Sequence, residues 1–406
     1  MGIERFCDDA ALWLNPRSGD ASRRPNHAAA ICTALPGQRG GTLWPSNPRL
    51  DVGLCASLSA EQNTGPLFGG GQRSPGPGGS DGGDVRSVGG RDADGGPRFD
   101  QVVPPGGYLW WYVDALSDCG QYGLTVIAFV GSVFSPYYAW ARQRLADRVD
   151  PENFCAINVA LYGRGGRRWT MTERGKRHVT RDARHFQVGP SSLHWNGDTL
   201  TIDVDEINVP IPRRVRGRVS VKPEGLSRFV TALDNEGLHR WGPLAPCSRV
   251  SVEMDNPQLN WVGHAYMDSN EGDEPVENGF KDWDWARCEM ANGDTCVVYD
   301  VRPQRGSNRV VAQRFSPNGD HEPFTPGQRF ALPASGWRIP RGMCNEINEA
   351  PQIISTLEDT PFYARSLLRT TLMGEPVTAM HESLDIPRLV SLPVRLMLPW
   401  RMPRRS

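Results

Sequence analysis

The sequence predicts an all-β protein made of antiparallel sheets. From Cys155 to about residue 345 it consists mostly of short apolar or alternating segments separated by turn residues, with few long helical patterns. Three Asn-Gly pairs each separate two such segments, and this pair favours two-residue β-hairpins because both central positions need positive φ. The pairs are Asn196-Gly197, Asn292-Gly293 and Asn318-Gly319. Short strands at this spacing are typical of antiparallel barrels or sandwiches.

Residues 1–97 differ in composition from the rest of the chain. From Gly69 to Pro97 more than half of the residues are Gly or Pro, and no apolar periodicity is present. Such a segment cannot bury enough apolar surface to offset the chain entropy lost on folding. We therefore expect residues 1–97 to be a disordered, dispensable extension, with ordered structure beginning near Phe99.

The composition of the chain limits the functions and cellular compartments to be expected. The formal net charge of −1 over 406 residues gives no reason to expect a nucleic-acid partner. Nine cysteines without paired spacing favour reduced thiols in a cytosolic setting over a disulfide framework. The N-terminal residues, MGIERFCDDAALWLNP, lack the charged, apolar and small-residue order of a signal peptide.

A long uncharged stretch lies between Asp118 and Arg142. It is long enough for a membrane-spanning helix, which needs about 20 apolar residues. Glycines, serines and Pro136 interrupt it, however, and its β-branched and aromatic residues suit strands. We therefore expect a buried hairpin strand and a turn here, followed by a short helix over Tyr137–Arg148.

The C-terminal segment is basic and apolar. After Asp385 no acidic residue occurs, while five arginines are interleaved with leucines, valines and Trp400. One interpretation is a tail that rests on an anionic membrane surface, where each cation contributes roughly 1 kcal/mol. The alternative is an ordinary barrel-edge strand with a solvated end.

The sequence lacks the motifs of several common chemistries. It has no H-E-x-x-H and no C-x-x-C pair, and its histidines are dispersed. The G-x-S-x-G elbow of serine hydrolases is absent, as is a G-x-G-x-x-G that opens a helix after a strand. We therefore expect neither a metal nor a cofactor, and acid–base chemistry remains.

Two segments place polar and aromatic side chains on common faces. Both are interpreted as strands, in which residues two apart project to the same side. If the two faces line one cavity, it holds a carboxyl, two imidazoles, a phenol and an indole. The residues are His264, Tyr266 and Asp268 in Leu259–Gly272, and His239 and Trp241 in Leu238–Gly242.

Aromatic residues are frequent in the ordered part of the chain. Their rings can line a pocket for a long apolar ligand and stabilise a passing cation, although most are expected to be core. In KDWDWAR, Trp283 and Trp285 alternate with Asp282 and Asp284, so rings lie on one strand face and carboxylates on the other. The sequence leaves open which face points inward.

Several long motifs resemble the acyclic carotenoid 1,2-hydratases (hydroxyneurosporene synthases) of photosynthetic bacteria. They are GGYLWWYVDALSDCGQYGLTVIAFVGSVFSPYYAWAR, PENFCAINVALYG, LHRWGPLAP and WVGHAYMDSNEG, and the likeness runs from about residue 100 to the end. The resemblance implies two lipocalin-like β-barrels, which we expect at 98–245 and 246–385, with a basic apolar tail at 386–406. It also implies cofactor-free addition of water to the terminal C1–C2 double bond of neurosporene, lycopene and similar carotenoids. The products are tertiary alcohols used in spheroidene and spirilloxanthin synthesis.

This reaction matches the residues already singled out. An alkene must be protonated at C2 before water captures the tertiary cation at C1, and an apolar environment can keep a carboxylic acid protonated near neutral pH. Asp268 is the expected general acid, while Trp241 and Tyr266 are expected to face the developing charge. His239 is expected to hold Asp268 in its protonated form or to deprotonate the attacking water. The resemblance places all four residues within motifs tied to activity.

Each of these residues also has a purely structural interpretation. Asp268 can start a turn through its side chain, and the two histidines and both rings can serve as packing residues. Two other functions remain open: a lipocalin-like carrier that binds carotenoid unchanged, and a proton-initiated prenyl cyclase. The expected partners are an acyclic carotenoid, water and a membrane surface, with no obligate protein partner. The expected location is peripheral, on the cytoplasmic side of the bacterial inner (photosynthetic) membrane.

Overall fold

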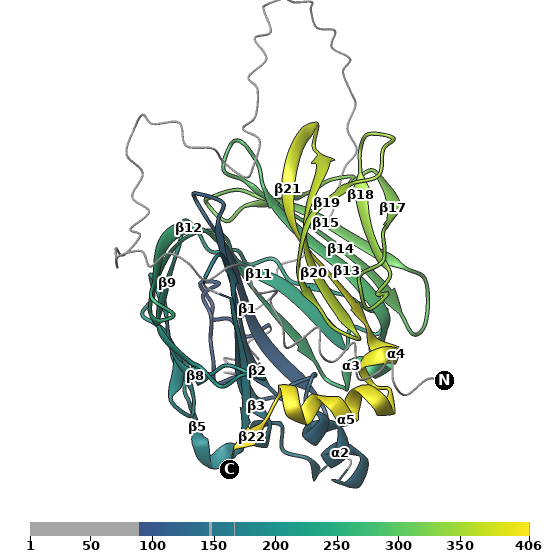
Figure 1. The fold of residues 1–406 in the computed structure, drawn as a ribbon. Helices are drawn as coiled ribbons and strands as arrows, with labels where there is room; N and C mark the ends of the chain where they lie inside the picture. Colours follow the sequence, from purple (N-terminus) through teal and green to yellow (C-terminus); the bar gives the residue numbers. More distant parts are fainter. Residues whose placement is uncertain (1–88, 146–147, 166, 406) are drawn as a thin grey trace, which may run out of the picture. The chain divides into compact units, whose positions relative to one another are not determined.

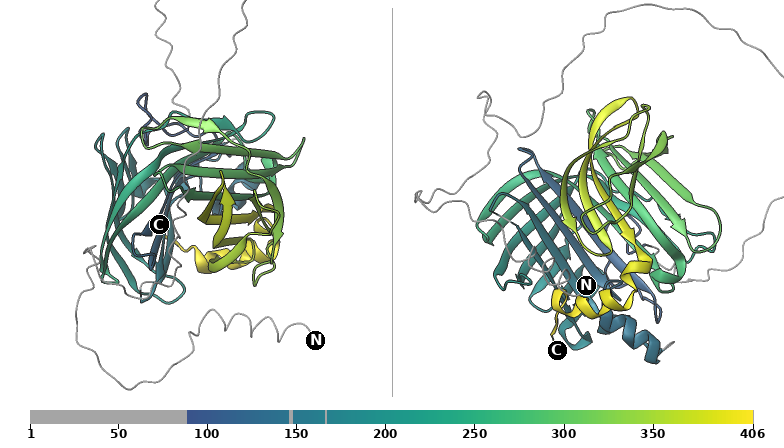
Figure 2. Two further views of the ribbon diagram at one scale, coloured as in Figure 1. Left: turned by 90° about the horizontal axis from the view of Figure 1, so that it is seen from above. Right: turned by 45° about the vertical axis from the view of Figure 1, so that its right-hand side comes forward.

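Two antiparallel β-sheets dominate the fold, which confirms the all-β prediction (Figure 1). The computed structural model describes residues 89–145, 148–165 and 167–405. The views in Figure 2 show both sheets curling, with the second sheet lying alongside the first. The expected disordered extension lies outside the described residues as far as residue 88.

Within the described residues, the first sheet has 13 strands in the order β22-β4-β3-β2-β1-β12-β11-β9-β8-β7-β6-β5, with β10 paired to β11. All neighbours are antiparallel except β22 and β4, which are parallel. The strands are β1 (Tyr108–Ser117), β2 (Tyr122–Val130), β3 (Cys155–Gly163), β4 (Arg168–Arg174), β5 (Val179–Arg181), β6 (His185–Val188), β7 (Ser191–Trp195), β8 (Leu200–Ile207), β9 (Arg214–Pro223), β10 (Thr231–Ala232), β11 (His239–Asn256), β12 (Leu259–Gly272) and β22 (Arg404–Arg405).

The second sheet of the described chain has seven strands in the order β16-β15-β14-β13-β21-β20-β19, and a separate hairpin pairs β17 with β18. These strands are β13 (Phe280–Glu289), β14 (Thr295–Pro303), β15 (Arg309–Phe315), β16 (His321–Pro323), β17 (Gln328–Leu332), β18 (Arg341–Asn345), β19 (Gln352–Asp359), β20 (Tyr363–Leu372) and β21 (Glu375–Asp385). The expected boundary between barrels at 245/246 falls inside β11, and β11 and β12 both pair within the first sheet. The chain therefore leaves the first sheet between residues 272 and 280, and it returns to that sheet at β22.

The sequence has a fourth Asn-Gly pair, Asn278-Gly279, which lies at the end of the short helix Val276–Gly279. The three pairs predicted to form hairpins do lie in hairpin turns, but the predicted turn type is wrong. They join β7 to β8, β13 to β14 and β15 to β16. In each turn the glycine has positive φ, whereas no asparagine among the described residues does. The connections have four or five residues, a length at which one left-handed position suffices, so glycine alone meets the requirement.

Strand alternation separates two cores. On β1, Leu109, Trp111 and Val113 belong to an apolar cluster enclosed by the first sheet. Tyr108 and Tyr112 point the opposite way, into a second cluster shared with strands of the second sheet. Because both sheets contribute side chains to this second cluster, the layer between them is buried from both sides.

Helices are short and few in the described part of the chain. They are α2 (Pro136–Leu145), α3 (Val276–Gly279), α4 (Ile386–Leu389), α5 (Leu392–Arg401) and the 3₁₀ turns η2 (Pro151–Asn153) and η3 (Lys176–His178). The uncharged stretch forms β2 and leads into α2, as predicted. The C-terminal tail is mostly helical before β22, so the alternative of an ordinary barrel-edge strand does not describe it. None of the helices in the described residues has the length and apolarity to cross a membrane.

Ordered structure begins earlier than Phe99. Arg91 is buried, and its guanidinium donates hydrogen bonds to the carbonyls of Ser227, Phe229 and Gly242, at 2.9–3.1 Å. Burial lowers the pKa of Arg91 to about 10. The Gly/Pro-rich composition concealed this anchor, because a single arginine that satisfies three backbone carbonyls leaves no periodic signal in the sequence.

Candidate active site

Asp268 lies in the buried layer between the sheets. It stands on β12 opposite Tyr112 of β1 and Pro243 of β11, and only 3% of it is exposed. Burial raises the pKa of this carboxyl to about 8, against the lowering effect of two hydrogen bonds that it accepts. The nearby carboxylates of Glu382 and Asp114 raise the pKa further. Asp268 is therefore mostly a neutral acid at pH 7.

Trp241 and Tyr266 both donate to the same oxygen of this carboxyl. The indole Nε1–H lies 2.8 Å from Asp268 Oδ2, and the Tyr266 hydroxyl lies 2.9 Å from it. The other oxygen, Oδ1, is buried and has no hydrogen-bond partner among the described residues. With Oδ2 accepting two hydrogen bonds, the proton of the neutral acid belongs on Oδ1. The two side chains thus orient the acid, a role that the sequence did not indicate.

Aromatic rings from both sheets surround the Asp268 carboxyl and its two donors. Trp285 of β13 lies 5.4 Å from both Tyr112 and Tyr266, measured between ring centroids. Tyr299 of β14 contacts Trp241 at 5.4 Å in an edge-on arrangement. These buried rings exclude water and present electron-rich faces, a combination that suits a carbocation.

The structure places the two predicted histidines away from Asp268. His239 Nδ1 lies 2.9 Å from the Tyr108 hydroxyl, and its Nε2 lies 3.4 Å from Glu274 Oε1. His239 pairs with Gly272, four residues along β12 from Asp268, or about 13 Å at strand spacing. The expectation that His239 holds Asp268 is therefore not met. Burial lowers the pKa of His239, so this imidazole is neutral at pH 7.

His264 lies at the solvent-accessible edge of the same strand. Its ring is 3.0 Å from Glu289 and 3.5 Å from Asp118, and its side chain is partly exposed. Alternation along β12 correctly grouped His264 with Tyr266 and Asp268 on one face. Position along the strand, however, separates an exposed end from a buried middle. His264 is therefore a surface ion-pairing residue.

Comparisons with known proteins identify the family of this chain. The family model "Carotenoid hydratase CrtC" matches residues 126–406. An acyclic carotenoid 1,2-hydratase of Rubrivivax gelatinosus is 59% identical over 398 residues, covering 98% of each chain. The chain belongs to the carotenoid hydratase family. A second acyclic carotenoid 1,2-hydratase, from Thiocapsa roseopersicina, is 50% identical and covers 97% of each chain. Among solved structures, a putative AttH of Nitrosomonas europaea has 15% identity and a TM-score of 0.47, covering 68% of this chain and 92% of its own.

Membership in the carotenoid hydratases confirms the resemblance found in the motifs. It also confirms the prediction of an enzyme, a hydro-lyase, at the level of the family. The family match does not assign roles to individual residues, so Asp268, His239, Trp241 and Tyr266 remain predicted site residues. Within the described residues, no group of three or more His, Cys, Asp and Glu side chains is arranged to hold a metal ion.

The sequence analysis missed a second buried carboxyl beside this candidate hydratase site. Asp114 of β1 is fully buried opposite Tyr266, and Arg287 of β13 donates to its Oδ1 from the facing sheet. A lone acidic residue within YLWWYVDAL was the available signal, because charged residues are rarely buried without a partner or a function. The partner, however, is 173 residues away in sequence.

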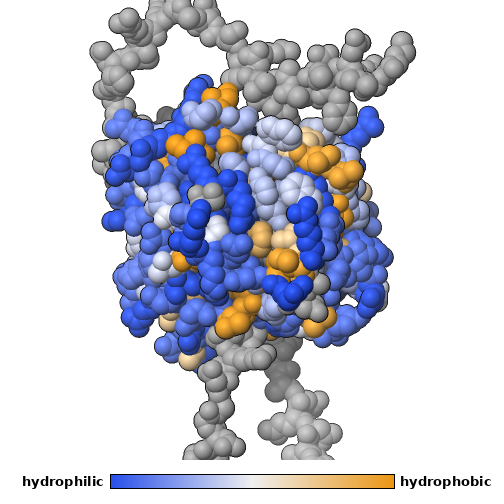
Figure 3. All heavy atoms as spheres, turned by 90° about the horizontal axis from the view of Figure 1, so that it is seen from below, coloured by the Kyte–Doolittle hydropathy of each residue, from blue (hydrophilic) through white to orange (hydrophobic). Residues whose placement is uncertain are grey.

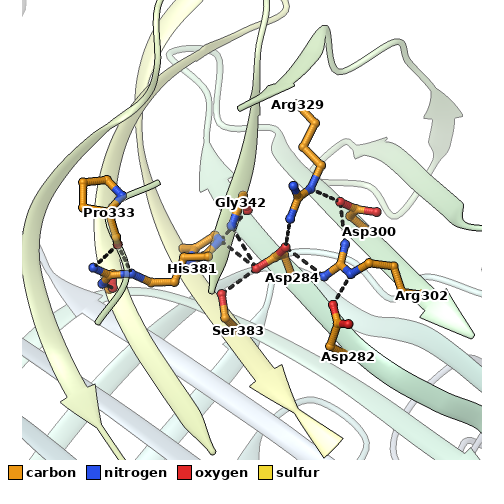
Figure 4. A network of polar contacts seen from close by, with 11 residues as sticks. Asp282, Asp284, Asp300, Arg302, Arg329, Pro333, Gly342, His381 and Ser383 are labelled. Carbon is orange, nitrogen blue, oxygen red and sulfur yellow. Dashed lines mark hydrogen bonds and ion pairs between the residues drawn. The ribbon is translucent and has the colours of Figure 1, made fainter. Parts of the chain in front are cut away.

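The structure shows which face of β13 points toward the layer between the sheets. Trp283 and Trp285 face the layer between the sheets, whereas Asp284 faces the other side of the second sheet. There, Asp284 accepts hydrogen bonds from Gly342, Ser383, Arg302 and Arg329, so both of its oxygens are satisfied (Figure 4). This carboxylate belongs to a structural network and not to the candidate site.

Proposed function

We propose that this chain hydrates the terminal C1–C2 double bond of acyclic carotenoids such as neurosporene and lycopene. One observation carries the proposal: the Asp268 carboxyl is buried among aromatic rings and kept neutral, with its pKa raised to about 8. A pKa of about 8 leaves about nine-tenths of the carboxyl protonated at pH 7. An unactivated alkene needs such an acid because it has no carbonyl group to polarise.

The chemistry begins with transfer of the Asp268 proton from Oδ1 to C2 of the carotenoid. The electron pair of the double bond forms the new C2–H bond and leaves a tertiary cation at C1. The hydrogen bonds from Trp241 and Tyr266 to Oδ2 stabilise the carboxylate that remains. The neighbouring rings stabilise the cation by about 2 kcal/mol or more where water is excluded. The oxygen of a water molecule then forms a bond to C1, one of its O–H bonds breaks as the proton passes to a base, and the product is a neutral 1-hydroxy carotenoid.

Incubation of purified protein with lycopene in ¹⁸O-labelled water tests this function. Mass analysis should show one labelled oxygen for each hydrated end, and Asp268→Asn should abolish the product while carotenoid binding persists. A carrier would return unchanged lycopene from the unaltered chain. A cyclase would give an isomer without added oxygen. Either result with folded, carotenoid-bound protein would exclude the hydratase.

We also propose that the protein works at an anionic membrane surface, on the cytoplasmic side of the bacterial inner (photosynthetic) membrane. Helix α5 supports this, because it is apolar on two sides. Val394 and Leu398 are buried against the protein, whereas an outward stripe of apolar side chains is exposed. That stripe consists of Leu392, Leu396, Met397 and Trp400, the last 77% exposed. Figure 3, which views the lower end of Figure 1, shows hydrophobic groups set among hydrophilic residues.

Charge on this face favours an anionic bilayer. Helices α2 and α5 contact each other, and neither contains an acidic residue. Of their arginines Arg144 is exposed, whereas Arg142 and Arg395 pair with Glu277 and Arg401 donates to the Val209 carbonyl. An exposed tryptophan beside cations is typical of residues that anchor a protein at the headgroup level of a bilayer. A carotenoid dissolved in the bilayer would then be reached from its surface.

Vesicle flotation tests the membrane surface. The protein should float with vesicles containing anionic lipid and much less with purely zwitterionic vesicles. Replacing Leu392, Leu396 and Trp400 by Gln should abolish flotation and leave turnover of detergent-dispersed lycopene intact. Ile211→Gln, at an exposed apolar residue outside α5, is the matched control. Equal flotation of the triple variant and the control would refute a role for α5.

A further inference from the structure

Two buried carboxyls face the same layer from neighbouring strands. Asp114 of β1 pairs with Tyr266 of β12, and Asp268 of β12 pairs with Tyr112 of β1. Paired residues of an antiparallel ladder project to the same side. Asp114 and Asp268 are therefore diagonal neighbours on one face, with Cα atoms about 7–8 Å apart. Each has one buried oxygen without a hydrogen-bond partner among the described residues: Oδ2 of Asp114 and Oδ1 of Asp268.

The contact between Arg287 and Asp114 leaves Oδ2 of Asp114 without a hydrogen bond. Both Nε and Nη2 of Arg287 donate to Asp114 Oδ1, the first at 2.7 Å, and neither reaches Oδ2. Arginine and carboxylate side chains often pair through two parallel hydrogen bonds that use both oxygens. Here the arginine fixes the carboxylate and its charge while one oxygen remains able to accept a proton.

Another buried ion pair, which lies within the first sheet, shows a carboxylate with both oxygens satisfied. Arg174 donates to Glu206 Oε1 at 2.6 Å, and Thr172 donates to Glu206 Oε2 at 2.9 Å. Both oxygens of Glu206 are therefore satisfied, as expected of a carboxylate with a purely structural role. Asp114 has the same kind of partner and comparable burial but keeps an unsatisfied oxygen beside the candidate acid.

We propose that Asp114 is the general base of the hydration, accepting on Oδ2 the proton of the water that attacks C1. The inference rests on the proposed function. It replaces the expected base, His239, whose ring nitrogens face Tyr108 and Glu274. In hydrolases that protonate one atom and activate water with a second carboxylate, the two carboxyls stand roughly 6.5–9.5 Å apart, which leaves room for the water. The diagonal placement of the two aspartates on one face of the sheet gives their backbones a spacing of the same order.

The proton balance closes with these two groups. Asp268 gives its proton to C2, and the C1–C2 π electrons form the new C–H bond. The water oxygen forms a bond to C1 while one of its O–H bonds breaks, and that proton passes to Asp114. The product is a neutral tertiary alcohol. Asp268 is then ionised and Asp114 protonated, and water returns the proton from Asp114 to Asp268 for the next turnover.

Charged groups from every neighbouring strand act on Asp114. Burial raises its pKa above the ordinary value, and the positive charge of Arg287 opposes that shift. A carboxylate whose pKa is raised above its ordinary value is a stronger base toward the attacking water. The titratable and charged groups that face it are Arg287, Arg365, Glu382, Tyr112, Tyr266 and Asp268.

Asp114→Asn tests the base, with Glu206→Gln as a matched control that also neutralises a buried carboxylate beside an arginine. With lycopene, Asp114→Asn should lower kcat about 100-fold or more. It should change KM less than threefold and abolish the acidic limb of the pH–rate profile. Glu206→Gln should keep turnover within threefold of the unaltered chain. If Asp114→Asn does not fold, Asp114→Asn combined with Arg287→Gln, which removes the unpaired cation, should show the same loss of kcat.

Azide separates a base from a merely structural carboxylate. The azide anion attacks a carbocation without giving up a proton, so it should add to C1 in Asp114→Asn and yield an alkyl azide detectable by mass. Asp268→Asn should form no such adduct, since no cation forms. Turnover of Asp114→Asn within threefold of the unaltered chain, or a loss no larger than that of Glu206→Gln, would overturn the assignment. So would the absence of an azide adduct from Asp114→Asn. Inactivity of the unaltered chain would refute the proposed function instead.

Discussion

Buried carboxylates of opposite character lie on the two sides of β13. On one side Asp284 is held by four hydrogen-bond donors, and neither oxygen lacks a partner. On the other side, across the layer lined by Trp285, Asp268 and Asp114 each leave one buried oxygen unsatisfied. Satisfied buried groups stabilise a fold, whereas unsatisfied ones cost stability and are retained where chemistry needs them. The contrast applies to these three aspartates, because buried Glu173, which pairs with Arg404, also has one oxygen without a hydrogen-bond partner among the described residues.

The largest expected effect comes from replacing one reactive and one structural carboxylate, each by asparagine. Asp268→Asn should reduce hydration more than 1,000-fold, because it removes the only proposed proton donor. Asp284→Asn should leave kcat within about threefold and instead lower the free energy of unfolding by about 1–3 kcal/mol. Turnover of lycopene and chemical denaturation of both variants check this. A catalytic loss in Asp284→Asn without loss of stability would end the distinction.

Removing one donor to Asp268 should have an intermediate effect. Trp241→Phe keeps a ring but loses the indole N–H that donates to Oδ2, which weakens stabilisation of the carboxylate after proton transfer. We expect a fall in kcat of about 10-fold to 100-fold. Because that hydrogen bond lowers the pKa of Asp268, its loss should also move the alkaline limb of the pH–rate profile to higher pH. Trp283→Phe is the matched ring control, and an equal loss there would argue for packing alone.

The pH dependence should differ between activity and stability. Activity requires protonated Asp268, so it should fall tenfold per pH unit above about pH 8. The folded-state pKa is raised above the unfolded value of about 3.9, so the stability from this group is full below that value. It is lost as pH rises to about 8. The melting temperature of Asp268→Asn should therefore rise relative to that of the unaltered chain between these pH values. A difference in melting temperature that stays constant with pH would contradict the raised pKa.

The smallest expected effect concerns Arg91, a buried cation whose two terminal nitrogens donate to three backbone carbonyls. Arg91→Gln should lower the free energy of unfolding by about 1–3 kcal/mol with little change in kcat, because the residue contacts carbonyls and not the Asp268 carboxyl.

Truncation before residue 89 should leave the stability of the protein unchanged, whereas truncation at 97, which removes Arg91, should lower it. This prediction opposes the expectation that all of residues 1–97 can be removed. Equal melting temperatures for the two truncations would restore it.

The sequence by itself determined the features that depend on near neighbours. Strand alternation placed Tyr266 and Asp268 on one face, the Asn-Gly pairs located three hairpins, and the motifs identified the family. These signals are local, since side-chain direction along a strand and turn formation are set by a few consecutive residues.

Only the tertiary structure decided which groups meet. The pairing of β1 with β12 brought Asp114 beside Asp268, and the packing of the second sheet supplied Arg287 and the Trp285 ring. The same packing directed Asp284 away from the site and left His239 with Tyr108. Register and sheet packing join residues more than 100 positions apart, and burial, which sets the pKa of Asp268, exists only after they have formed.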